Sequence, residues 1–388
     1  MRWSKKDILD IIDKNNLQVG TSFYAYDLDI CLEKIENVRK NFRDWNLIYS
    51  IKANPNITLL KKFVELGLGM DAASKEEVLL ARSLGCPPDR IFYSSPGKAL
   101  FDLKCCYNQC VLVADSSNEV NRILTLSEEL CCPINIGIRI NLPNPNIKGN
   151  AFEVMGGSRS KFGMTTQELE LISRACKGSM VNIIGIHIYF GSQILNESVL
   201  ISNFITIADY AIELCNKFKL NFVTFGGGFG VPYSESDKSL NLSHIAFEEC
   251  LQDKISQLKS KNIKCNLELG RYLVAESGVF CASIEDIKVS YNKKYVILSA
   301  GMNAFIRPIF TKEFHKLNSC KPLGLPVEKV TIVGNLCTPI DQYYEDYEIE
   351  SPEIGDWLWF ENAGAYGYSM SMLHFISHDL PLELIKVF

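Results

Sequence analysis

The most constraining feature of this sequence is a repeated alternation of short apolar runs and longer amphipathic segments between residues 47 and 270. The runs are rich in β-branched and aromatic residues, as strands are, and the segments between them have the helical period. Eight runs can be counted, at 47–52, 69–73, 91–95, 111–115, 135–140, 183–189, 222–228 and 265–270, with helical segments at 57–67, 75–85, 116–130, 166–178 and 198–218. Eight parallel strands alternating with helices close on themselves, so the sequence predicts an α/β fold of the (β/α)8 TIM-barrel type.

Polar residues gather where these runs end. They are Lys52, Asp71, Arg139, His187, Tyr189, a glycine triplet at 226–228 and Glu268. The active site of a (β/α)8 barrel lies at the C-terminal ends of its strands. Strand ends are often polar because they meet water, but that accounts poorly for a lysine, a glycine triplet and a glutamate on one face. We therefore predict the active site at this face.

The helical period fades after residue 275, and short strand-like runs follow. They lie at 280–290, 294–300, 328–334, 356–362 and 382–388, and the run at 21–27 has the same character. Such runs predict a mostly antiparallel second domain, similar to a β-sandwich or β-barrel. We expect the barrel over 28–274 and this β domain over 1–27 and 275–388.

Composition narrows the classes of partner. The net charge of −5 leaves no excess of Lys and Arg for a nucleic-acid footprint. The N-terminus carries charges where a secretory signal would be apolar, and no uncharged run approaches the roughly 20 residues that span a bilayer. The 14 cysteines are spread over a large chain and have no paired CxxC spacing, which favours reduced thiols over disulfides or zinc. We expect a cytoplasmic protein with no metal, nucleic-acid or membrane partner.

Three features at the strand ends suit a cofactor site. Lys52 lies among apolar residues, where burial favours the neutral amine that can attack an aldehyde. The segment at 225–233, FGGGFGVPY, can bring backbone N–H groups close to a phosphate, although it could also be an ordinary tight turn. Glu268 could keep a cofactor pyridine nitrogen protonated, and Arg271 could meet a phosphate or a structural carboxylate.

Ten motifs in one order resemble the fold-type III decarboxylases that use pyridoxal 5′-phosphate (PLP), the group of diaminopimelate, ornithine and biosynthetic arginine decarboxylases. They are YSIKANPN (49–56), GMDAASKEE (69–77), SPGK (95–98), SKFGM (160–164), GIHIYFGSQI (185–194), GGGFGVPY (226–233), ELGR (268–271), AGMNAFIRP (300–308), LCTP (336–339) and GAYGYSMS (364–371). The resemblance runs from about Thr21 to the C-terminus and is strongest to the diaminopimelate branch. It implies an alanine-racemase-like barrel and a β domain.

The resemblance also implies roles for individual residues. Lys52 would carry PLP as a Schiff base, and Cys337 would protonate the carbanion left by decarboxylation, acting across the interface of a homodimer with shared sites. The cofactor-binding residues would be Lys52, Asp71, Arg139, Tyr189, Ser192, Gly227, Gly228, Glu268, Arg271 and Tyr366, and the substrate-binding residues Arg307, Thr338 and Tyr366. No metal is implied.

Two departures from the family pattern concern the cofactor and the substrate. Tyr189 stands where the family has a histidine that stacks on the cofactor, so an aromatic ring remains but an imidazole does not. Thr338-Pro339 follow Cys337, where diaminopimelate decarboxylases have Glu-Ser and the glutamate recognises the distal amino group. Arg307 remains at the position of the arginine that takes the distal carboxylate, although it could equally form a surface ion pair. The segment 372–381 lacks the usual Asn- and Arg-containing run.

These departures resemble the branch of the glutamyl-carrier-protein decarboxylase of butirosin biosynthesis, which shares the CTP, HIY-type and MGG features, the last at Met155-Gly156-Gly157. They favour an amino acid tethered to a carrier or nucleotide as substrate, in a specialised pathway such as antibiotic biosynthesis. The alternatives are diaminopimelate decarboxylase of lysine biosynthesis and a non-catalytic PLP-binding relative. Because Lys52, Glu268 and Cys337 are all retained, the sequence favours a catalyst.

Overall fold

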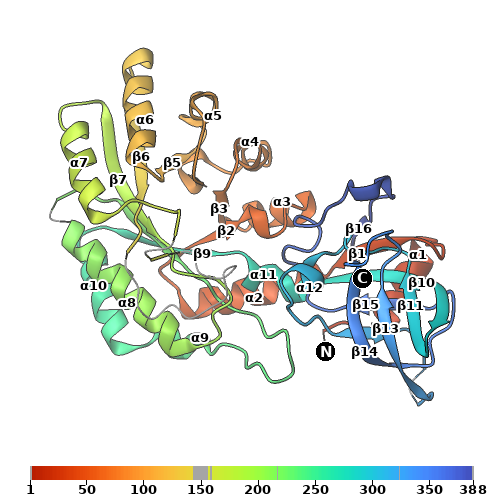
Figure 1. The fold of residues 1–388 in the computed structure, drawn as a ribbon. Coiled ribbons are helices and arrows are strands. Elements are labelled where there is room, and N and C mark those ends of the chain that lie inside the picture. The colour runs from red at the N-terminus through yellow and green to blue at the C-terminus, as the bar shows by residue number, and fades with distance from the viewer. Residues whose placement is uncertain (1, 143–155, 158–159, 216, 323, 387–388) are drawn as a thin grey trace. The chain divides into compact units, whose positions relative to one another are not determined.

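The computed structural model describes residues 2–142, 156–157, 160–215, 217–322 and 324–386. The chain forms two compact units, which are described separately (Figure 1). One, the barrel unit, consists of Glu36–Gly230 and Ser239–Gly270. The other, the β unit, consists of Met1–Ile35, Val231–Lys238 and Arg271–Phe388. Met155, one of the three residues of the MGG feature, lies outside the described residues.

The barrel unit contains a closed barrel of eight parallel strands, which confirms the predicted fold. In chain order the strands are β2 (Asn46–Ser50), β3 (Gly69–Ala72), β4 (Ile91–Ser94), β5 (Val111–Ala114), β6 (Ile134–Arg139), β7 (Val181–Ile188), β8 (Phe222–Gly226) and β9 (Lys264–Leu269). Each strand pairs with its neighbours in sequence, and β9 closes on β2 with Ile48 opposite Glu268. All eight expected strands form, each within two residues of its expected bounds.

Helices follow the strands of the barrel unit. They are α2 (Leu28–Asn41, which begins in the β unit), α3 (Ile57–Glu65), α4 (Lys75–Ser83), α5 (Leu100–Cys106), α6 (Ser117–Leu130), α7 (Thr166–Cys176), α8 (Glu197–Leu214), α9 (Leu242–Ala246) and α10 (Glu249–Ser260), with 3-10 turns η1 (Ile51–Ala53) and η2 (Pro88–Arg90). The five expected helices begin at Asn or Ser/Thr caps, such as Asn56 and Ser74, which accept backbone N–H groups of the first turn. Unpredicted α5 follows Ala99, whose side chain offers no such cap.

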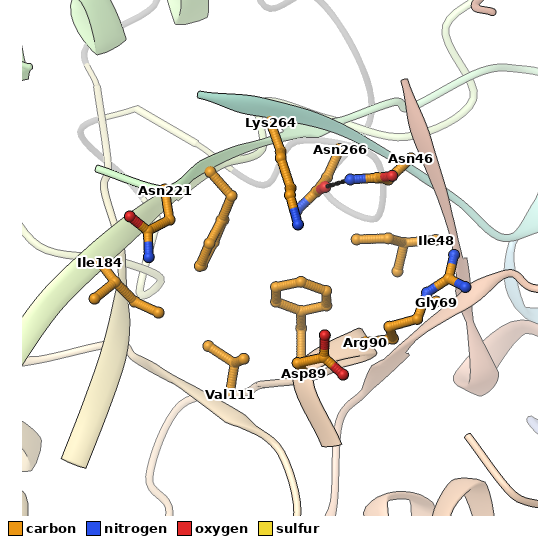
Figure 2. Close-up of a pocket in the computed structure, with 12 residues that line it drawn as sticks. Asn46, Ile48, Gly69, Asp89, Arg90, Val111, Ile184, Asn221, Lys264 and Asn266 are labelled. Atoms are coloured by element: carbon orange, nitrogen blue, oxygen red, sulfur yellow. Dashed lines mark hydrogen bonds between the residues drawn. The ribbon is translucent and has the colours of Figure 1, made fainter. Parts of the chain in front are cut away.

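A hollow of about 520 Å³ lies at the end of the barrel where the strands begin, opposite the C-terminal strand ends that carry the predicted site residues (Figure 2). Its apolar floor includes Phe222, whose ring lies against Gly185 so closely that a Cβ there would overlap it. The rim is polar, with the Lys264 side chain pointing into the hollow. This end carries none of the predicted site residues, and barrel enzymes do not place their chemistry there.

The β unit is built on an eight-stranded, mostly antiparallel sheet. Its strands are β1 (Ser22–Tyr26), β10 (Gly278–Ser290), β11 (Lys293–Leu298), β12 (Leu317–Ser319), β13 (Val327–Val333), β14 (Gln342–Glu350), β15 (Trp357–Phe360) and β16 (Leu382–Ile385). The pairs β1–β16 and β11–β13 are parallel and the others antiparallel. The six expected strands form. The prediction omits β12, which is short, and β14, which is mostly polar because much of it is exposed.

An N-terminal helix, α1 (Lys5–Lys14), completes the core of the β unit. Ile8 and Ile11 pack with Trp3, Phe23 and Trp357. The remaining elements are α11 (Arg271–Val274), η3 (Ala275–Ser277), α12 (Arg307–Phe310) and η4 (Phe375–Ser377). Among the described residues, no helix is long and apolar enough to cross a bilayer.

Candidate active site

A cluster of charged side chains occupies the C-terminal end of the barrel and centres on Lys52. The strand β2 ends at Ser50, and the turn η1 places Lys52 just beyond it. Its Nζ lies 3.0 Å from Asp71 Oδ2 and 3.9 Å from Glu268 Oε1. The lysine side chain is 37% exposed, whereas the two carboxylates are 1% and 6% exposed. The amine is therefore reachable, and its two carboxylate partners are held inside the barrel.

Glu268 is fixed from two further directions. His187 Nε2 on β7 lies 2.8 Å from Glu268 Oε2, and the Ser50 hydroxyl donates to Glu268 Oε1 at 3.1 Å. The sequence placed His187 at a strand end without giving it a role, and it gave none to Ser50. Both face Glu268 because strand ends that are distant in sequence meet at one rim of a closed barrel.

The two carboxylates differ in their electrostatics. Burial and the Glu268 charge raise the pKa of Asp71 above its ordinary value, and the Lys52 ammonium only partly offsets them. Burial also opposes ionisation of Glu268, but His187 and Lys52 hold the pKa of Glu268 well below its ordinary value. Glu268 is thus the permanent anion of the cluster, and Asp71 is the carboxylate that accepts a proton more readily.

The glycine triplet forms the turn after β8 and requires small residues. The Tyr189 ring packs on Gly226, and a Cβ on Gly226 would overlap that ring. Gly227 N–H donates to the Glu268 carbonyl at 3.0 Å. Gly228 has φ +64° and lies against the Gly191 carbonyl, so a side chain is excluded on two grounds. The turn therefore brings bare backbone to the rim of the barrel.

The loop that carries Ser192 is joined to this glycine turn by backbone hydrogen bonds. Ile194 N–H donates to the Gly228 carbonyl at 2.9 Å, and Gly230 N–H donates to the Ile194 carbonyl at 3.0 Å. Gln193, next to Ser192, has φ +57°. Ser192 and Gly228 are thus held on adjoining loops, an arrangement that suits an anion bound by backbone and hydroxyl donors.

Arg139, at the end of β6, is buried and incompletely paired. Its Nε lies 3.8 Å from Asp115 Oδ1, and its guanidinium lies over the Phe162 ring at 4.5 Å. Among the described residues, its Nη2 has no hydrogen-bond partner. A buried donor without an acceptor is costly and points to a bound group or support role.

The remaining predicted residues belong to the β unit, where Arg271, Arg307 and Tyr366 lie together. The two guanidinium groups lie 5.2 and 5.4 Å from the centre of the Tyr366 ring. Tyr366 has φ +58°, a conformation that is costly for a tyrosine and concentrates at functional sites. Both arginines pair with Glu313, a residue that the sequence prediction missed.

Cys337 and Thr338 lie in the loop between β13 and β14, and Cys337 is exposed. The loop is anchored by Asp341, whose carboxylate accepts from Leu336 N–H at 3.0 Å and from Met302 N–H at 2.7 Å. Asp341 is buried against Gly301 and Gly334, where any Cβ would overlap it. The prediction missed Asp341, because its role depends on contacts with Gly301 and Gly334 that only the folded chain brings together.

Within each unit, then, the predicted residues gather in groups. The barrel unit holds Lys52, Asp71, Arg139, Tyr189, Ser192, Gly227, Gly228 and Glu268 at the C-terminal end of its strands. The β unit holds Arg271, Arg307, Cys337, Thr338 and Tyr366. The described residues include no cluster of three or more His, Cys, Asp or Glu side chains that could hold a metal.

Comparison with known proteins gives consistent results. Residues 28–275 match the model of the pyridoxal-binding domain of pyridoxal-dependent decarboxylases. The chain is 31% identical to an L-glutamyl-[BtrI acyl-carrier protein] decarboxylase of Niallia circulans, over 94% of this chain and 89% of that protein. It is 32% identical to a diaminopimelate decarboxylase of Aquifex aeolicus, over 91% and 83% of the two chains.

Solved structures agree with these matches. A diaminopimelate decarboxylase from Helicobacter pylori, complexed with L-lysine, is 30% identical and superposes with a TM-score of 0.85 over 94% of this chain and 91% of that chain. An arginine decarboxylase from a Paramecium bursaria Chlorella virus, at 20% identity and a TM-score of 0.83, shares the fold over 98% of this chain and 100% of that one. From its sequence, fold and site, the chain belongs to the family of pyridoxal-dependent decarboxylases.

Proposed function

We propose that this PLP-dependent decarboxylase removes the α-carboxylate of an amino acid whose side chain is tethered to a larger group, in a specialised biosynthetic pathway. The observation that carries the proposal is Thr338, which stands directly after Cys337 and offers a hydroxyl instead of a carboxylate. A distal ammonium buried beside it would have no anionic partner from this position. The 31% identity to a carrier-protein-linked glutamyl decarboxylase supports the same substrate class.

The residues at the barrel rim fit the cofactor. An amine within reach of two carboxylates, a turn in which Cβ atoms are excluded at Gly226 and Gly228, and the unmet donor of Arg139 are the features such a group requires. We infer that Lys52 carries PLP, Glu268 pairs with its ring nitrogen, and Ser192, Gly227 and Gly228 bind its phosphate. By the same inference, Asp71, Arg139 and Tyr189 support the cofactor. The family resemblance adds Arg271 and Tyr366 to the proposed cofactor-binding residues.

The chemistry then divides between cofactor and chain. When bound, PLP supplies an electron sink for the pair left on Cα as carbon dioxide departs. Glu268 favours that sink because its carboxylate stays ionised and can stabilise a protonated ring nitrogen. Cys337 delivers a proton from Sγ to Cα, which restores a tetrahedral carbon. Asp341 acts as a positioning residue by fixing the loop that presents Cys337.

We further propose that the enzyme is a homodimer in which Cys337 completes the site of the partner subunit. Cys337 is exposed, as a residue that serves another subunit would be in the isolated chain. Mixing the Lys52→Ala and Cys337→Ala variants tests this. Random reassociation should restore about a quarter of wild-type turnover, because half of the dimers are mixed and each has one intact site. No restoration by dimers shown to have exchanged subunits would exclude shared sites.

Diaminopimelate decarboxylation is the second candidate, and it is favoured by Arg307 and by the 32% identity to the Aquifex aeolicus enzyme. The two candidates are separated by rescue of a lysine auxotroph that lacks its own diaminopimelate decarboxylase. We expect no rescue by this chain. Growth without lysine, at an expression level where the Lys52→Ala variant fails to support it, would favour the second candidate.

A further inference from the structure

The side chain of Glu313 is shared by the two arginines of the β unit. Arg271 Nη1 lies 3.2 Å from Glu313 Oε1, and Arg307 Nη2 pairs with Glu313 Oε2. The three side chains are largely buried, with 10% of Arg271, 4% of Arg307 and 13% of Glu313 exposed. Arg307 therefore offers almost no surface to an incoming anion.

Glu313 is the one carboxylate that forms an ion pair with Arg307 in the described part of the chain. The other contacts of this guanidinium are weak or aromatic: Nη1 lies 3.7 Å from Met370 Sδ, and the Tyr366 ring centre lies 5.4 Å away. Burial opposes ionisation of Glu313, but Arg271 and Arg307 lower the pKa of this carboxyl below its ordinary value. Glu313 is consequently an anion at neutral pH.

A second carboxylate would be disfavoured at this place for two reasons. The guanidinium fork binds a carboxylate best through two parallel N–H donors, and Glu313 already holds one of the terminal nitrogens of Arg307. An added anion would also lie close to the Glu313 charge, and like charges repel strongly in a partly buried site, where water screens them little.

We propose that Glu313 is a specificity-determining residue: it occupies Arg307 as an internal counter-ion, so that the enzyme takes substrates whose distal end is an uncharged acyl linkage, such as an amide or thioester, instead of a free carboxylate. This inference rests on the proposed function and deepens it. A carboxylate whose carbon is tied up in such a linkage has no charge to compete with Glu313. Thr338 and Glu313 then both disfavour a substrate with a free distal ammonium and carboxylate. Thr338 offers no anion to the ammonium, and Glu313 occupies the arginine that would bind the carboxylate.

The test compares two probes that differ by one group. L-Lysine and meso-diaminopimelate share the α-amino acid end and the distal amine, and only the second has a distal carboxylate. Binding of each to the PLP-loaded protein is measured from the change in cofactor absorbance, which needs no turnover. The proteins are wild type, Glu313→Gln, the double variant Arg307→Gln/Glu313→Gln, and Glu345→Gln, which removes a surface carboxylate of the same unit.

We expect wild type and Glu345→Gln to bind the two probes with affinities within about threefold of each other, because both arginines of this cluster are already paired with Glu313. Glu313→Gln should bind meso-diaminopimelate at least about tenfold more tightly while its affinity for L-lysine is unchanged, since a charge-assisted bond of this kind contributes about 1.5 kcal/mol or more. The double variant should lose that gain. Because it buries no unpaired arginine at position 307, it separates the effect of a released Arg307 from the loss of the Arg271–Glu313 pair, which both variants share.

Two results would overturn the inference. One is an unchanged ratio of affinities in folded, PLP-loaded Glu313→Gln. The other is a wild-type preference for meso-diaminopimelate of about tenfold or more that Arg307→Gln/Glu313→Gln abolishes, which would mean that Glu313 gives way to the substrate. Either result concerns the distal end alone, whereas failure of the proposed function would appear as an absence of carbon dioxide release from any tethered amino acid.

Discussion

The charged cluster of the barrel and that of the β unit have opposite compositions. At the barrel rim one cation, Lys52, lies between two carboxylates, Asp71 and Glu268. In the β unit one carboxylate, Glu313, lies between two cations, Arg271 and Arg307. In each cluster one central charge pairs with two opposite charges, and both partners are at least as deeply buried as the central group.

Because their charge balance differs, the two clusters can accept different chemical groups. The barrel cluster has an excess of negative charge, and its lysine is the exposed member, so it suits a cationic ring attached through an amine. The arginine cluster has an excess of positive charge but exposes little of it, so it suits a neutral or distant polar group. An open, reactive cluster and a closed, internally paired one thus occur in the same chain.

Removal of the lysine should break the barrel cluster most severely. In Lys52→Ala we expect turnover to fall by about 1,000-fold or more and the covalent PLP absorbance to disappear, because Lys52 is the lysine that pairs with Asp71 and Glu268 in the described part of the chain. Absorbance spectra and carbon dioxide release measure both. Lys264→Ala, at the opposite end of the barrel, is the matched control and should keep both properties. A coloured and active Lys52→Ala would show that another residue carries the cofactor.

Neutralising Glu268, the carboxylate that stays ionised, tests whether it and Asp71 have different roles in the barrel. In Glu268→Gln we expect PLP to remain bound while turnover falls by about 100- to 1,000-fold, because the electrostatic support for a protonated ring nitrogen is lost. Titration of PLP occupancy beside turnover separates these effects. Asp71→Asn should be less damaging to turnover. The reverse order would mean that Asp71, whose pKa is raised, is the catalytically important anion.

Substitution of Cys337, an exposed cysteine of the β unit, tests whether that unit contributes a reacting group. In Cys337→Ala we expect normal PLP binding and turnover lowered by about 100-fold, at the lower end of what a positioned proton donor contributes. Product analysis in deuterated water should show altered protonation at Cα. Cys250→Ala removes another exposed thiol and serves as the control. Unchanged kinetics and product in Cys337→Ala would remove it from the mechanism.

A further expected effect is on stability instead of turnover and concerns His315, which lies beside the arginine cluster. Burial and Arg307 lower the pKa of His315 to about 4. Because the unfolded chain binds this proton near pH 6.5, the folded state should lose up to about 3 kcal/mol as the pH falls from 6.5 to 4. In His315→Phe this part of the pH dependence should disappear from denaturant titrations. If the stability of His315→Phe depends on pH as that of wild type does, other groups cause the dependence.

The sequence predicted the barrel because all eight strands stand out as apolar runs and five of the segments between them keep the helical period. It predicted Lys52 and Glu268 because both stand at the ends of apolar runs, where a charge is conspicuous. It could not predict that Ser50 and His187 hold Glu268, because that contact depends on the closure of β9 onto β2 and on the approach of β7. Helices α5, α9 and α10 were not among the predicted helical segments; α5 and α9 are short, and α5 lacks a capping side chain.

In the β unit the sequence was less informative. Arg307 was expected either to meet a distal carboxylate or to form an ion pair, and only the folded chain shows that Glu313, six residues later, pairs with it. Nothing in the local pattern distinguishes this glutamate from those on the surface. Asp341 was missed for a related reason: its importance comes from Gly301 and Gly334, which leave room for its carboxylate.

The most direct test of the account is carbon dioxide release by the PLP-loaded protein from free meso-diaminopimelate, measured beside a panel of free amino acids and of amino acids linked to a carrier protein or nucleotide. The account predicts turnover of a linked amino acid at a kcat/KM at least about tenfold above that of any free one. Efficient turnover of free meso-diaminopimelate, with no linked amino acid preferred to it, would contradict it.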